Sequence, residues 1–196
     1  MSTIVEKAVC TSCGHIHGIT AYPSINVSDT PELKEKVLSG EIFTWQCPDC
    51  GAMNLAKYPM VYHDPAERLL IVLSETPLNA EEVPEGYIAR QVSNVGDFVE
   101  KIKIFDAGLD DVIMEVCKYV TANELGKQVQ LKFFQIDGAD HEITLTYPQN
   151  GQMEMISTGF NVYEDCAGIV NRNPVLRENA QGLARIDRDW VQRFFR

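Results

Sequence analysis

The chain has 196 residues, a hydrophobic fraction of 45% and a formal net charge of −11. These values predict one medium or two small globular domains and exclude wholesale disorder. No run approaches the roughly 20 apolar residues that span a bilayer, and residues 1–7 lack the apolar segment of a signal peptide. We therefore predict a cytoplasmic protein, in which paired cysteines bind metal more often than they form disulfides.

The first part of the chain predicts short strands around two cysteine pairs. The helix signal is Asp29-Thr30-Pro31-Glu32, with Thr30 as the N-cap and Pro31 where its missing N–H costs nothing. Gly40 ends this helix. The predicted elements are, in chain order, strands over 5–9, 15–22 and 24–27, a helix over 30–39, and strands over 41–46, 55–62 and 69–73.

The rest of the chain predicts a linker and a second domain. Residues 76–86 hold two prolines and three glutamates with little apolar content, which is typical of a linker. Asn150-Gly151 is the favoured two-residue turn of a β-hairpin. The predicted elements are a short strand over 87–91, helices over 94–104 and 109–120, an antiparallel meander over 129–157, and helices over 162–171 and 186–195.

Together these elements predict an α+β fold of two units. We expect residues 1–75 to form a zinc-ribbon-like N-terminal unit with an inserted helix, and residues 76–86 to form a linker. Helices and an antiparallel β-meander over 87–196 then form an α+β C-terminal domain.

Four cysteines predict one metal site. Cys10 and Cys13 form a C-x2-C-G motif, and Cys47 and Cys50 form a C-P-x-C-G motif 33 residues later. Two residues between cysteines let a tight turn direct both sulfurs at one point, and the following glycines can adopt a positive φ. Four thiolates in a tetrahedron suit Zn²⁺ and leave no position for a catalytic water, so we predict a structural zinc ion.

The same cysteines have three other interpretations. Two disulfides would need an oxidising compartment. A thioredoxin-like redox pair would need one CxxC motif followed by a βαβ pattern. Rubredoxin-like iron is the alternative metal, because a rubredoxin also has two such knuckles. The helix predicted between the knuckles at residues 30–39 does not resemble that fold.

The motifs resemble those of the bacterial CpXC domain family, which is named for its paired cysteine motifs. The similar segments are Cys10-Thr-Ser-Cys-Gly, Tyr22-Pro-Ser-Ile-Asn-Val, Pro31-Glu-Leu-Lys-Glu-Lys-Val-Leu-Ser-Gly-Glu, Cys47-Pro-Asp-Cys-Gly and Tyr62-His-Asp-Pro. The resemblance covers residues 5–75 and extends more loosely through 104–111. Thr11 departs from the pattern, because proline is expected there. The resemblance supports the metal and implies no substrate.

Several further residues have both a functional and a structural interpretation. His15 and His17 are additional candidate ligands, but we expect them to lie outside the ligand set. His63-Asp64 could form an acid–base pair, although a turn before Pro65 is the expected role. The remaining expectations are helix capping by Asp106, Asp110 and Asp111, a core position for Cys117, and no activating histidine for Cys166.

Charge and the C-terminal helix suggest how the protein functions. Residues 76–125 carry 4 basic and 10 acidic side chains, a net charge of −6. Six arginines lie between Arg172 and Arg196, and we expect them to pair with this acidic region. Trp190 and Phe194 lie one turn apart in the predicted helix over 186–195. Trp and Arg are enriched at interaction hot spots, whereas the alternative is that this helix packs on its own meander.

We therefore expect a zinc-stabilised binding or assembly module with a protein partner, which could be a second copy of the chain. A nucleic-acid-associated zinc ribbon is the first alternative, and the net charge of −4 over residues 1–75 opposes it. An enzyme with a site in the C-terminal unit is the second alternative. That unit has a single histidine, His141, so we predict no catalytic centre there.

Overall fold

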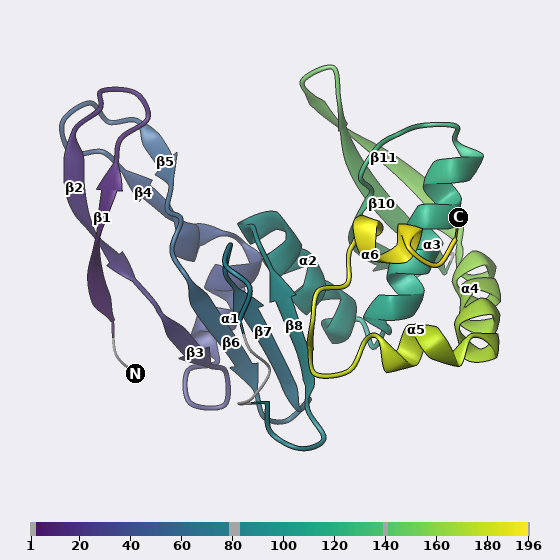
Figure 1. Ribbon diagram of the computed structural model, residues 1–196. Helices are drawn as coiled ribbons and strands as arrows, with labels where there is room; N and C mark the ends of the chain where they lie inside the picture. Colours follow the sequence, from purple (N-terminus) through teal and green to yellow (C-terminus); the bar gives the residue numbers. More distant parts are fainter. Residues whose placement is uncertain (1–2, 79–82, 139–140, 196) are drawn as a thin grey trace. The chain divides into compact units, whose positions relative to one another are not determined.

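The computed structural model describes residues 3–78, 83–138 and 141–195. It divides the chain into two compact units, residues 1–99 and 100–196. Both helices and antiparallel strands are present, which confirms the predicted α+β class (Figure 1).

Two antiparallel hairpins carry the cysteine motifs of the first unit. Strand β1 (Ile4–Val9) pairs with β2 (Ile16–Ala21), and β4 (Thr44–Gln46) pairs with β5 (Met53–Leu55). Each CxxCG motif forms the turn of its hairpin, and Figure 1 shows the two turns at the same end of the unit. The hairpins thereby bring cysteines that are distant in sequence into one place.

A mixed sheet forms the body of the first unit. Within the unit its strands follow the order β8 (Ile88–Val92), β7 (Leu69–Leu73), β6 (Met60–Asp64) and β3 (Ser24–Asn26). Phe98 packs edge to face on Phe43 and Tyr62, with ring centroids 5.9 and 6.3 Å apart, and all three rings are fully buried. These aromatic contacts join the start of a helix to the sheet and to the segment that leads to the second cysteine pair.

Two local predictions differ from the structure between the cysteine pairs. Helix α1 (Glu32–Leu38) has Pro31 at its N-cap, because the Thr30 hydroxyl donates instead to the Asn26 carbonyl oxygen at 3.0 Å. The predicted strand over 41–46 begins as the 3₁₀ turn η1 (Glu41–Phe43). Gly40, with a φ of 77°, turns the chain there, so only the last three residues form a strand.

The division into units also falls later than the linker predicted over residues 76–86. Strand β8 pairs in parallel with β7, from Leu69–Ile88 to Leu73–Val92, and therefore belongs to the same sheet. The Ser74 N–H extends this ladder by donating to the Val92 carbonyl oxygen at 2.9 Å. Residues 79–82 of the predicted linker lie outside the described residues.

Helix α2 (Val95–Asp106) starts in the first unit and ends in the second, where α3 (Asp111–Glu124) follows.

The predicted meander is confirmed: β9 (Lys132–Asp137), β10 (Glu142–Gln149) and β11 (Gln152–Gly159) form an antiparallel sheet in the order β11-β10-β9. Asn150 and Gly151 have φ values of 52° and 78°, as a two-residue hairpin turn requires.

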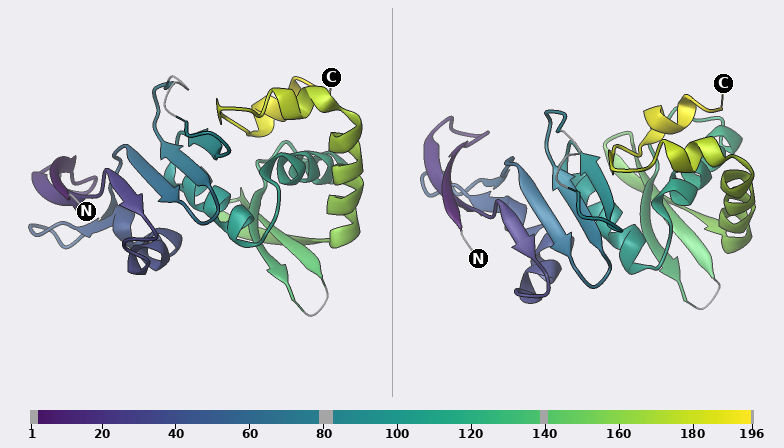
Figure 2. Two further views of the ribbon diagram at one scale, coloured as in Figure 1. Left: turned by 90° about the horizontal axis from the view of Figure 1, so that it is seen from below. Right: turned by 60° about the horizontal axis from the view of Figure 1, so that its bottom comes forward.

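Helices cover this sheet in the second unit. Figure 2 shows α3 and α4 (Phe160–Arg172) beside the sheet, followed by α5 (Pro174–Glu178), β12 (Leu183–Ala184) and α6 (Arg188–Gln192). Trp190 and Val191 of α6 are 3% and 0% exposed and belong to the unit's hydrophobic core. Trp190 is therefore not available as a surface hot spot. Helix α6 packs against α3 of its own unit, whereas the alternative prediction was packing on the meander.

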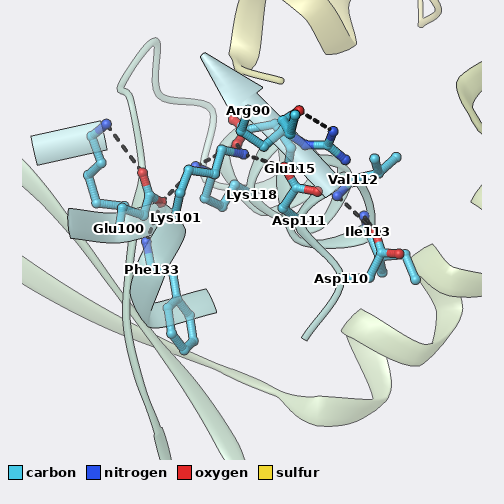
Figure 3. Close-up of polar contacts among 12 residues, drawn as sticks. Arg90, Glu100, Lys101, Asp110, Asp111, Val112, Ile113, Glu115, Lys118 and Phe133 are labelled. Carbon is cyan, nitrogen blue, oxygen red and sulfur yellow. Dashed lines mark hydrogen bonds and ion pairs between the residues drawn. The ribbon is translucent and has the colours of Figure 1, made fainter. Parts of the chain in front are cut away.

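Five charged side chains are buried together in the second unit, which is unusual because an unpaired buried charge is costly. We call this set the buried ion network: Glu100, Lys101, Asp111, Glu115 and Lys118, each at most 5% exposed. Lys101 Nζ lies 2.9 Å from Asp111 Oδ2, and Lys118 Nζ lies 2.7 Å from Glu100 Oε1. Figure 3 shows these residues and their contacts. Glu100 Oε1 also accepts the Phe133 N–H at 2.7 Å. The network thus joins α2, α3 and β9.

Candidate metal centre

The two cysteine turns have nearly the same backbone geometry. In the first turn the Gly14 N–H donates to the Cys10 carbonyl oxygen at 2.9 Å, and in the second the Gly51 N–H donates to that of Cys47 at 2.8 Å. Gly14 and Gly51 have φ values of 77° and 74°, which is the reason that glycine follows each pair. The shared conformation presents two thiols from each turn to a common centre.

Two of the distances between the four sulfur atoms match the edge of a tetrahedral site. The Sγ atoms of Cys10 and Cys50 lie 3.6 Å apart, and those of Cys13 and Cys47 lie 3.7 Å apart. All four sulfurs lie within 4.8 Å of one another. A tetrahedron with metal–sulfur bonds of about 2.3 Å has edges of about 3.8 Å. The cysteines predicted from the sequence therefore come together in an arrangement that fits one metal ion.

Asn54 joins the two turns beneath the sulfurs. Its Oδ1 accepts hydrogen bonds from the Thr11 N–H at 2.8 Å and the Thr11 hydroxyl at 2.9 Å, and its Nδ2 donates to Cys10 Sγ at 3.5 Å and to the Ala52 carbonyl oxygen at 2.9 Å. Asn54 is only 5% exposed, so these bonds are shielded from water. Sequence analysis missed this residue, because a single asparagine after a turn carries no signal for a contact 43 positions away.

Comparison with known proteins places the chain in a family. The model of the CpXC protein family matches residues 8–118, which is more than half of the chain and includes all four cysteines. The chain belongs to the CpXC family. No curated protein and no solved structure matches it.

The CpXC match confirms the resemblance seen in the sequence and extends it through most of α3. In the first motif, Thr11 stands where the family pattern has proline. Proline has no N–H, so it could not donate the hydrogen bond that Thr11 gives to Asn54. The threonine thus exchanges the fixed φ of proline for two hydrogen bonds that tie the two turns together.

The pKa values of Cys10 and Cys13 shift in opposite directions. Hydrogen bonds from the Cys13 and Ser12 backbone N–H groups and from Asn54 lower the pKa of Cys10 to about 6 against the effect of burial. The His15 backbone N–H lowers the pKa of Cys13, but burial and the neighbouring thiols Cys10, Cys50 and Cys47 outweigh it and raise that pKa to about 12. A divalent ion bound between the sulfurs would stabilise every thiolate at once.

His15 and His17 lie beside the cysteines and not among them. His15 Nδ1 is 2.5 Å and His17 Nε2 is 3.2 Å from Asp49 Oδ2. His17 Nε2 is also 3.6 Å from Cys47 Sγ. The hydrogen bond from His15 is the main cause that lowers the pKa of Asp49, so this carboxylate stays ionised. Asp49 was not predicted as a site residue, because its partners are 34 and 32 positions away.

Most other candidate residues have structural roles. His63 Nε2 contacts the Tyr87 hydroxyl at 3.2 Å, while Asp64 accepts the Glu67 N–H at 3.3 Å as expected for a turn. Asp110 caps α3 by accepting from the Val112 and Ile113 N–H groups. Among the described residues, the clusters that could hold a metal are the four cysteines and the set of His15, His17 and Asp49.

The remaining cysteines and arginines belong to the packing of the second unit. Cys117 and Cys166 are buried in its core, where a hydrogen bond between the two thiols lowers the pKa of Cys117 and raises that of Cys166. Arg177 pairs with Asp110 of the acidic middle region at 2.5 Å, as expected, whereas Arg185 pairs with Asp187 and Arg188 donates to Gln128 Oε1, which both lie outside that region. No helix among the described residues is long and apolar enough to cross a membrane.

Proposed function

We propose that Cys10, Cys13, Cys47 and Cys50 bind one structural Zn²⁺ ion, and that the protein is a zinc-stabilised binding module for another protein. The observation that carries the zinc assignment is the tetrahedral spacing of the four sulfurs. Four protein ligands fill the coordination sphere of Zn²⁺, so the ion has no position for substrate or water. Its role is then to hold the two hairpins together.

Protein purified without added metal is expected to contain one zinc ion per chain. Because thiolates bind the metal and protons compete for them, acidification should release zinc steeply. Elemental analysis and a chromophoric zinc indicator would measure content and release. A red protein that contains iron would instead favour the rubredoxin-like alternative, and zinc retained unchanged at pH 4 would contradict thiolate ligation.

The proposed partner surface is an exposed apolar face of the first hairpin. In the β1–β2 ladder Val9 pairs with Ile16, so their side chains lie on one face, and Val5 lies on the same face four pairs further along. These three side chains are 58%, 64% and 78% exposed. We call them the hairpin apolar face. Exposed apolar side chains gathered in this way are typical of protein interaction sites, and the acidic charge of the chain opposes nucleic acid instead.

The variant Val9→Ser/Ile16→Ser is expected to lose the protein partner while keeping the fold and the metal. Cross-linking of the tagged protein in native lysate, followed by mass spectrometry, would show which proteins the wild type contacts, including a second copy of itself. The matched control is Met153→Ser/Met155→Ser, which changes two exposed apolar residues of β11 in the second unit. Equal cross-links in wild type and variant would contradict the hairpin apolar face as the partner surface. Cross-links that are lost on nuclease treatment would favour nucleic acid as the partner.

A further inference from the structure

Three donor groups meet beside the cysteine centre. Asp49 lies between Cys47 and Cys50 in the second turn, and His15 and His17 follow the first turn at alternate positions of one strand end. One ligand atom from each lies within 4.8 Å of the other two. The cluster brings together residues of both hairpins, and nothing in the cysteine chemistry requires it.

We propose that His15, His17 and Asp49 form a second, exchangeable site for a first-row divalent transition ion. The ligands are two imidazole nitrogens and one carboxylate oxygen, a donor set that suits Zn²⁺, Co²⁺, Ni²⁺ or Fe²⁺. The site rests on the proposed zinc centre, because the turn that carries Asp49 is held in place by Cys47 and Cys50.

The donor spacing is close to what an ion needs. Metal–ligand bonds of about 2.0–2.2 Å place the donors of one ion about 3 Å apart. His17 Nε2 already lies 3.2 Å from Asp49 Oδ2, and His15 Nδ1 lies 2.5 Å from the same atom. The contact between His15 Nδ1 and Asp49 Oδ2 must widen. The His15 and Asp49 side chains are 64% and 47% exposed, so they can move to make room.

Burial and charge indicate an open site with exchangeable ligands. Three protein donors leave positions for water, and the exposed side of the cluster gives the ion access to solvent. Four thiolates around a zinc dication carry a net charge of −2, and Cys47 Sγ is 3.6 Å from His17 Nε2. This negative charge attracts a second cation to the adjacent donors.

Cobalt provides a direct test. The full-length protein is first loaded with one equivalent of Zn²⁺, which the cysteine site keeps because Zn²⁺ binds more tightly than Co²⁺. Co²⁺ is then added and followed by absorption and by proton NMR. One further equivalent is expected to bind with weak visible bands, no sulfur-to-cobalt charge transfer, and shifted ring N–H resonances from two histidines.

Variants separate this site from general cation binding. His15→Ala and Asp49→Asn should each weaken the affinity for the second equivalent, Co²⁺, at least tenfold and leave the tightly held zinc in place. His141→Ala, which removes a histidine of the other unit, should change neither. Saturation at one zinc with no cobalt bound, or cobalt binding that is equal in all variants, would overturn the second site. A strong charge-transfer band from cobalt added to metal-free protein tests the cysteine centre separately, and its absence would contradict the proposed function instead.

Discussion

Replacing Cys47 with serine is expected to release the metal and unfold the two cysteine hairpins. Cys47 is 1% exposed and its sulfur lies 3.7 Å from that of Cys13, so serine would leave a buried position with a poor ligand. Structural zinc supplies roughly 10–16 kcal/mol of apparent binding free energy, which is comparable to the whole stability of a domain. Hydrogen exchange should therefore become fast in β1, β2, β4 and β5 and stay slow in the second unit.

Two comparisons make the Cys47 experiment specific. Ser12→Ala changes an exposed residue inside the first turn, and we expect it to keep both the metal and slow exchange. Removal of the metal from the wild type by a chelator should reproduce the exchange pattern of Cys47→Ser. The structural role of the metal is refuted when exchange in the hairpins is as slow in Cys47→Ser as in the wild type.

Replacing Glu100 with alanine is expected to destabilise the second unit by about 3–5 kcal/mol, because it removes one partner from a buried ionic set. Glu100 Oε1 binds Lys118 Nζ and accepts the Phe133 N–H, and both donors would lose this acceptor. Glu100 and Glu115 together raise the pKa of Lys118 against the effect of burial. Urea unfolding would measure the change in the free energy of unfolding, and hydrogen exchange of α3 would measure the change within the second unit.

The matched control for Glu100 is Glu154→Ala, which removes an exposed carboxylate of β11. Its expected effect on the free energy of unfolding is within about 0.5 kcal/mol, as for most surface substitutions. A loss below about 1 kcal/mol for Glu100→Ala would mean that water reaches Lys118 and Phe133 N–H, and would contradict the dry character of the buried ion network.

Local sequence signals predicted the parts of this molecule that depend on near neighbours. The CxxCG spacing fixes each cysteine turn, because the glycine that ends each motif adopts a positive φ. Asn150-Gly151 predicted the hairpin turn between β10 and β11 for the same reason. In these cases the decisive contacts are a few residues apart, so the pattern of residue types contains most of the information.

Contacts between distant residues decided what the sequence did not predict. Phe43 packs on Phe98 across 55 positions and turns inward from a 3₁₀ turn, where the sequence predicted the start of a strand. The parallel pairing of β7 and β8 placed residues on both sides of the predicted linker in one sheet. Asp49 and Asn54 acquired their roles only because the second hairpin meets the first.

The bonds between Thr11 and Asn54 have a consequence for how sequences of the CpXC family vary. A proline at position 11 supplies neither of the two donors that Asn54 Oδ1 accepts, so it removes the role of that oxygen and leaves only the bonds from Nδ2 to Cys10 Sγ and the Ala52 carbonyl oxygen. The two positions should therefore change together: threonine or serine with asparagine, and proline with a residue that needs no donor. An alignment of homologues would then show the meeting of the two hairpins as a covarying pair outside the cysteines.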